Sequence, residues 1–190
     1  VQSGVGHLVL GAGAARARLG ARPPPLDFTV LGGFAVRRGS WQAEDGAWDR
    51  RVAQRLVRYL LVRRGGVVSE DLLLEAFWPD TPEPSARRSL KVAASCARAV
   101  LDVPGSPSVI EGVERTLALR LREGDSVDAD RFEDAARVAL TAEPGERRAL
   151  LERAAGLWTG DPLPEERYSD WASAWRESLT VGYAEVLAAL

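Results

Sequence analysis

Cationic side chains and one hydroxyl group gather between residues 87 and 98, and they are Arg87, Arg88, Lys91, Ser95 and Arg98. On an α-helix, the spacings of three, four and three from Arg88 to Arg98 keep four of them on one side over roughly 15 Å. Arginine can hold guanine with two hydrogen bonds, and lysine and arginine bind phosphates, so this side suits the major groove of duplex DNA. The alternative is the solvated basic face of an ordinary amphipathic helix.

An apolar stripe on the same segment predicts the helix that would carry these cations. The stripe consists of Ala86, Leu90, Ala94, Ala97 and Leu101. Its spacing indicates a helix that starts between Pro82 and Ser85 and ends near Leu101, with the stripe facing a core. The cationic residues fall on another face of this helix.

Two helices precede this one. A change to helical periodicity after Arg50 predicts a helix that ends at Gly65-Gly66. Ser69 is a good N-cap, and Glu70 and Asp71 would lie in a favourable first turn. The second helix is therefore expected to run to about Trp78, where a proline follows.

Short strands are expected on both sides of these helices, over residues 26–31, 34–37, 109–110 and 116–121. The first two would meet at Gly32-Gly33, and the last two would surround a turn at Gly112. Residues 38–49 would form a loop or a third strand. The order of strands, three helices and a hairpin is typical of a winged helix-turn-helix.

The last third of the chain is predicted to be helical, over about 128–140, 146–158 and 168–190. Pro144-Gly145 and residues 159–162 would break it. Helix pairs with short turns favour a TPR-like array. The predicted fold class is thus mainly α with small β: a winged helix-turn-helix followed by a TPR-like helical module.

Composition narrows the classes of function. The chain has 190 residues, with 25 basic and 27 acidic side chains and a net charge of −2. One cysteine and one histidine argue against a structural zinc site and against enzymes that depend on a catalytic histidine. No apolar run approaches the ~18–20 residues of a membrane span. We therefore expect a cytoplasmic protein with no catalytic residues, cofactor or metal.

The charge is distributed unevenly and predicts three segments. Residues 1–25 would be a linker or the remnant of an upstream domain, and residues 26–125 a nearly neutral winged-helix domain. Residues 126–190, with seven basic and thirteen acidic side chains, would be an acidic helical domain. The absence of methionine, even at position 1, suggests a piece of a longer chain, and the helical domain is expected to be truncated.

Two stretches carry a resemblance to a known family. The run Leu72-Leu-Leu-Glu-Ala-Phe-Trp-Pro-Asp80, followed by Ser85-Ala-Arg-Arg-Ser-Leu-Lys-Val92, resembles the response-regulator-type winged helix of bacterial activators. Val127-Asp-Ala-Asp-Arg-Phe-Glu133, Leu157-Trp-Thr-Gly-Asp-Pro-Leu-Pro164 and Asp170-Trp171 resemble the bacterial transcriptional activator domain. Together they resemble SARP-type transcriptional activators over about residues 27–190.

This resemblance implies sequence-specific binding of double-stranded DNA in transcription activation. The helix over about 83–101 would be the recognition helix, and the 109–121 hairpin would be the wing, with Arg115 near a phosphate. The loop from Asp80 to Pro84, with Asp80, Thr81 and Glu83, would contact RNA polymerase. A homodimer on direct DNA repeats is a further possible assembly, and no membrane partner is expected.

The sequence also departs from the family pattern. Family members commonly end the recognition helix with a Leu-Arg-Arg-like run, whereas this chain has Cys96-Ala97-Arg98-Ala99. The wing usually carries a Gly-Tyr pair, near which Glu114-Arg115-Thr116 stands here. Fewer cations mean fewer phosphate contacts and weaker binding. These departures sustain the alternative of a protein-interaction or regulatory module whose degenerate winged helix no longer binds DNA.

Weaker signals have simpler interpretations. Gly11-x-Gly13-x-x-Arg16 resembles a dinucleotide fingerprint, but it lacks the third small residue, so a linker is the default. Cys96 is expected to be a small packing residue rather than a redox switch. Core packing is the expected role of four tryptophans, Trp78, Trp158, Trp171 and Trp175. Acidic residues at a helix N-terminus, rather than a cation site, explain Asp128, Asp130 and Glu133.

Overall fold

The computed structural model describes residues 23–190. Its strands are β1 (Leu26–Thr29), β2 (Ala35–Arg38), β3 (Trp41–Gln42), β4 (Val68–Ser69), β5 (Ile110–Val113), β6 (Thr116–Leu119) and β7 (Ser126–Val127). Its helices are α2 (Arg51–Val62), α3 (Glu70–Phe77), α4 (Glu83–Leu101), α5 (Asp128–Leu140), α6 (Pro144–Gly156) and α7 (Asp170–Ala189), with short 3-10 turns at Asp45–Ala47 and Pro164–Glu166. These elements form a mainly helical fold with small sheets, as the sequence predicts.

The strands form two small sheets. One has the order β3-β2-β1-β7, in which β1 and β2 are an antiparallel hairpin and β7 runs parallel to β1. The other has the order β4-β6-β5 and is antiparallel. No sequence pattern marks β4 or β7, because strands of two residues are too short to show a periodicity.

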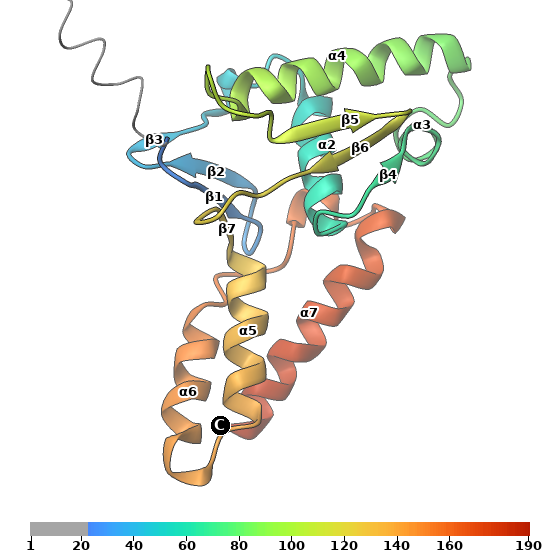
Figure 1. Ribbon diagram of the computed structural model, residues 1–190. Coiled ribbons are helices and arrows are strands. Elements are labelled where there is room, and N and C mark those ends of the chain that lie inside the picture. Colours follow the sequence, from blue (N-terminus) through green and yellow to red (C-terminus); the bar gives the residue numbers. More distant parts are fainter. Residues whose placement is uncertain (1–22) are drawn as a thin grey trace, which may run out of the picture.

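Helix α2 lies at the centre and contacts α4, β6 and α7 (Figure 1). Its buried face includes Leu56, Tyr59 and Leu60, each at most 2% exposed. Helix α4 lies along one end of the molecule, while α5, α6 and α7 extend from the opposite side (Figure 1). One continuous core therefore connects the winged-helix part to the helical part, and its members range from Leu26 to Val186.

The hairpin of β5 and β6 turns at a different place from the one expected. Gly112 lies within β5, and the turn is formed by Glu114 and Arg115, with φ of 45° and 63°. A Cβ atom at Gly112 would lie 3.2 Å from the Leu117 side chain and 3.3 Å from that of Arg98. A side chain at this position would therefore crowd both neighbours, which is consistent with glycine inside a strand where groups approach closely. The two central residues instead adopt the positive φ of a two-residue hairpin, although neither is glycine.

The helical part confirms the expected helices with shifted ends. Pro144 and Gly145, which the sequence suggested as a break, form the first turn of α6, where proline needs no hydrogen-bond donor. Aromatic packing joins the three helices, with the ring of Phe132 edge-on to Trp158 and the rings of Trp158 and Tyr183 stacked at 4.4 Å. No helix among residues 23–190 is long and apolar enough to span a membrane.

Candidate nucleic-acid interface

Helix α4 is held in place by its apolar stripe and by its C-terminal end. All five stripe residues are buried, as predicted: Ala86, Leu90, Ala94, Ala97 and Leu101. At the C-terminal end, the Arg38 guanidinium donates a hydrogen bond to the carbonyl of Leu101. A cation in this position also compensates the negative end of the helix dipole. Burial lowers the pKa of Arg38, but an arginine side chain stays protonated at neutral pH.

The opposite face of α4 carries two cations that have no partner in the described structure. Arg88, Lys91 and Ser95 are exposed, and their side chains make no ion pair or hydrogen bond with any of residues 23–190. Lys91 also borders a cleft of about 250 Å³ between α4 and the β5–β6 hairpin. These side chains can therefore bind an external anion or acceptor without first breaking an internal contact.

Arg98 has a partly structural role. Its Nε donates to the carbonyl oxygen of Ile110 at 2.9 Å, which ties α4 to β5. Gly112 makes this approach possible, because a Cβ there would crowd the Arg98 Nη2 atom. The Arg98 guanidinium lines the cleft between helix and hairpin. It is thus placed between the helix face and the wing.

Two of the predicted DNA-contacting residues, Arg87 and Arg115, form ion pairs with carboxylates. Arg87 pairs at 2.7 Å with each of Glu70, Asp71 and Glu83. Arg115 pairs with Asp71 at 3.1 Å and with Glu83 at 3.8 Å. The hydrogen bond that Arg87 donates to the Glu83 carboxylate raises the pKa of Arg87. We call these five residues the carboxylate cluster, and within it three acids surround two cations.

Replacing Asp71 with asparagine should remove one negative charge from the carboxylate cluster and free Arg115 more than Arg87, which keeps Glu70 and Glu83 at 2.7 Å. Asp71 is the one acid that pairs with Arg87 and Arg115 at about 3 Å, and its side chain is 72% exposed. If both arginines contact DNA phosphates, Asp71→Asn raises DNA affinity and makes the salt dependence of log K steeper by about one per cation released. The measurement is a salt series of binding curves. Asp134→Asn, at an exposed acid paired with Arg137 on α5, is the matched control and should change neither quantity.

The loop between α3 and α4 contains the acids assigned to a polymerase contact. Asp80 is exposed and Thr81 is half-buried, and the amide of Thr81 donates to the carbonyl of Trp78 at 3.1 Å. Glu83 belongs to the first turn of α4 and its carboxylate pairs with Arg87. Asp80 is therefore the loop acid with no ion-pair partner among the described residues.

A buried ion pair that the sequence did not reveal joins the two parts of the chain. Arg58 of α2 binds Glu166 at 2.9 Å, and their side chains are 10% and 4% exposed. Arg55 also reaches Glu166, at 3.3 Å, and the hydroxyl of Ser169 donates to the same carboxylate at 2.6 Å. The partners are separated by more than a hundred positions, so no local pattern marks them.

The acids at the start of α5 have structural partners. Asp128 accepts hydrogen bonds from the backbone amides of Val30, Leu31 and Ala129 at 2.8, 3.1 and 2.8 Å. Asp130 and Glu133 both pair with Arg64. Burial raises the pKa of Asp128 despite the three amides. No group of three or more potential metal ligands exists among residues 23–190.

The remaining candidate residues either pack against the core or lie outside the residues that the structure describes. Cys96 is half-buried against the core, and so are the four tryptophans, as core packing requires: Trp78, Trp158, Trp171 and Trp175. The Gly11-x-Gly13 motif with Arg16 lies outside the described residues.

Comparison with known proteins supports the family resemblance. No family model matches the sequence. The chain is 32% identical over 142 residues to the Regulatory protein AfsR of Streptomyces griseus, and this match covers 73% of the chain but 14% of that protein. Its fold is similar to that of Mycobacterium tuberculosis EmbR, solved in complex with a low-affinity phosphopeptide, with a TM-score of 0.70, 20% identity, and coverage of 85% of this chain and 43% of that one.

The match to AfsR shows that this chain is homologous to part of a regulatory protein, and it agrees with the resemblance to SARP-type regulators. The identity to EmbR is low, so that comparison establishes the fold alone. The chain spans a small part of AfsR and less than half of the EmbR chain.

Proposed function

We propose that the chain is a sequence-specific, double-stranded DNA-binding regulator of transcription, with no catalytic role, whose helix α4 enters the major groove. The observation that carries the proposal is the solvent face of α4, where Arg88, Lys91 and Ser95 are exposed and make no ion pair or hydrogen bond with the described part of the chain, residues 23–190. This face is fixed by a buried apolar stripe on the other side of the same helix. The relation to SARP-type regulators supports the same assignment.

The residues on this face differ in whether their side chains already have a partner within the described structure. Arg88 and Lys91 can reach base edges, because both are exposed and neither is paired with any residue that the structure describes. Arg98 is oriented by its bond to Ile110, which suits a fixed phosphate contact next to the wing. Arg87 and Arg115 are assigned to phosphates and would exchange carboxylates of the cluster for DNA oxygens.

Further parts of the proposal follow from the family relation. Residues 26–125 are the DNA-binding domain and residues 126–190 the transcriptional activator domain, here joined through β7 and the Glu166 ion pair. The protein acts in the cytoplasm, and a homodimer could bind direct DNA repeats. RNA polymerase is the second macromolecular partner, contacted by the loop that contains Asp80 and Thr81.

One observation favours a second candidate function. Two of the predicted DNA-contacting residues, Arg87 and Arg115, are neutralised by three carboxylates at the end of the groove face. Acids in that place repel phosphates. They favour a protein-interaction or regulatory module whose winged helix no longer binds DNA.

The two candidates differ in a direct binding experiment. Residues 1–190 are used to select duplexes from a library of genomic fragments, and the selected duplex is titrated at several salt concentrations. DNA binding through this interface gives log K that falls linearly with log salt, by about 0.9 per phosphate contact. A folded protein that enriches no fragment and binds no duplex at low salt supports the interaction module instead.

Charge reversal at Asp80 should separate transcription from DNA binding. We expect Asp80→Lys to reduce transcription from a promoter that carries the selected site and to leave duplex affinity unchanged, because the side chain lies in the loop beside α4 and makes no ion pair within residues 23–190. Both quantities are measured on the same protein preparation. Glu146→Lys on exposed α6 is the control. An equal loss of binding and transcription would show that the loop has no separate role.

A further inference from the structure

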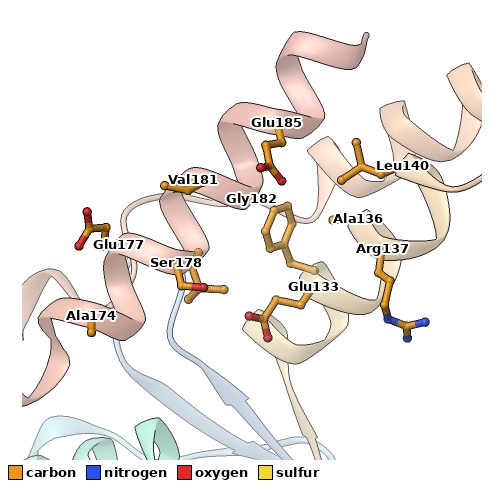
Figure 2. A pocket seen from close by; sticks show the side chains of 12 residues that line it. Glu133, Ala136, Arg137, Leu140, Ala174, Glu177, Ser178, Val181, Gly182 and Glu185 are labelled. Atoms are coloured by element: carbon orange, nitrogen blue, oxygen red, sulfur yellow. The ribbon is translucent and has the colours of Figure 1, made fainter.

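A groove in the helical part lies apart from the α4 surface. It runs between α5 and α7 and has a volume of about 630 Å³ (Figure 2). Its floor contains Phe132 and Leu140, together with a row of small residues on both helices: Ala136, Ala174, Ser178 and Gly182. Val181, which is 51% exposed, lies at the α7 rim. The groove is therefore an apolar channel between two helices that remains open to solvent.

The rim of this groove is acidic. Glu185 points into the space between the helices, as does Glu133, whose carboxylate pairs with Arg64, and Glu177 lies at the outer edge of α7 (Figure 2). Glu177 and Glu185 make no ion pair or hydrogen bond through their side chains with any of residues 23–190. The rim cation, Arg137, is already paired with Asp134 at 2.7 Å. Residues 126–190 carry a net charge of −6, so the wider field also attracts cations.

We propose that this groove binds a basic amphipathic helix of a partner protein. Glu177 and Glu185 are two turns apart on α7, about 12 Å, with Val181 midway between them. A helix with two cations seven or eight positions apart and aliphatic side chains between them matches this order of acid, apolar residue and acid. Its aliphatic side chains would fill the channel, as in other helix-in-groove complexes.

The small residues make room for such a helix. A methyl group added at Gly182 would meet the Phe132 ring at 4.0 Å, an ordinary contact, and the space beyond it is the channel itself. The groove lies between the parts of α5 and α7 that extend away from α4 (Figure 1). A partner bound between α5 and α7 therefore leaves the α4 face free, and the two binding events can be measured separately.

The test uses two labelled synthetic helices of about 18 residues, roughly 27 Å long. One carries lysines eight positions apart with leucines on the same face between them, and the other carries glutamates in place of the lysines. Fluorescence anisotropy with residues 1–190 at low salt should show binding of the lysine peptide alone. The double variant Glu177→Lys/Glu185→Lys should raise the Kd about tenfold or more. Glu152→Lys on exposed α6 is the matched control.

Two substitutions at Gly182 probe the shape of the groove. Gly182→Leu fills the channel and should abolish binding, whereas Gly182→Ala should retain it, and both should keep or raise the melting temperature because alanine and leucine favour helices. The proposal would be overturned if the wild-type protein did not bind the lysine peptide. It would also be overturned if the charge-reversed variant or Gly182→Leu bound the peptide as tightly as the wild type. A wild-type dimer that Gly182→Leu converts to a monomer would also overturn it, in favour of a second copy in the groove.

Discussion

Replacing Glu166 with alanine is expected to lower the free energy of unfolding by about 3–5 kcal/mol. The substitution leaves the Arg58 guanidinium, 10% exposed, buried without its carboxylate, and it also removes the acceptor for Arg55 and Ser169. Chemical denaturation followed by circular dichroism measures the loss. Since Arg58 lies on α2 and Glu166 follows α6, the loss should appear in a single transition for the whole chain.

Two further variants separate the ion pair from general effects of substitution. Glu152→Ala removes an exposed acid that pairs with Arg148, and it should cost less than about 1 kcal/mol. Arg58→Met with Glu166→Met replaces both buried charges by apolar side chains and should be less destabilising than Glu166→Ala alone. A Glu166→Ala effect as small as that of the surface control would refute the role of this pair in joining the two parts.

Replacing Asp128 with alanine is expected to cost about 3 kcal/mol or more. Three backbone amides, those of Val30, Leu31 and Ala129, lose their acceptor at a buried position, and each unsatisfied group costs about 1–3 kcal/mol. Asp128→Asn should cost less, because its one carbonyl oxygen can still serve Val30 and Ala129, which both donate to Oδ1. Equal stability of wild type and Asp128→Ala would contradict this account.

The pH dependence of the Asp128→Asn comparison has a defined sign. Burial raises the pKa of Asp128 above its ordinary value of 3.8, so the folded state binds the proton more tightly than the unfolded state. This contribution to stability is complete below pH 3.8 and is lost as the pH rises through the raised pKa. The stability of the wild type relative to Asp128→Asn should therefore fall over that window. A relative stability that rises with pH would contradict the assigned direction.

Helix α4 shows how much local sequence can determine. Its expected start between Pro82 and Ser85, its end at Leu101 and its buried stripe are all confirmed, because nineteen residues give the helical period many repeats. Ser69 is likewise the N-cap of α3 and accepts the amide of Leu72. Local signals therefore placed the face that carries Arg88 and Lys91.

Contacts between residues that are distant in the sequence could not be predicted from local patterns. The partners of Arg87 on α3 lie 16 and 17 positions away, and those of Arg58 and Asp128 are about a hundred positions away. The number of acids and arginines can be read from the sequence, but the pairs that they form cannot. The hairpin turn was misplaced for a related reason: the glycine lies inside β5, where it is closely packed, and the positive φ falls on Glu114 and Arg115.

The most direct test of the central claim is a salt series of binding curves for Arg88→Ala and Lys91→Ala on the selected duplex and on a scrambled one. Arg153→Ala, an exposed arginine on α6, is the control. If the α4 face reads bases, each α4 variant should lose about 1–3 kcal/mol of affinity for the selected duplex, with little change on the scrambled one, while the control binds as the wild type does. Unchanged binding by both α4 variants, with the fold intact, would contradict the claim and remove α4 from the DNA interface.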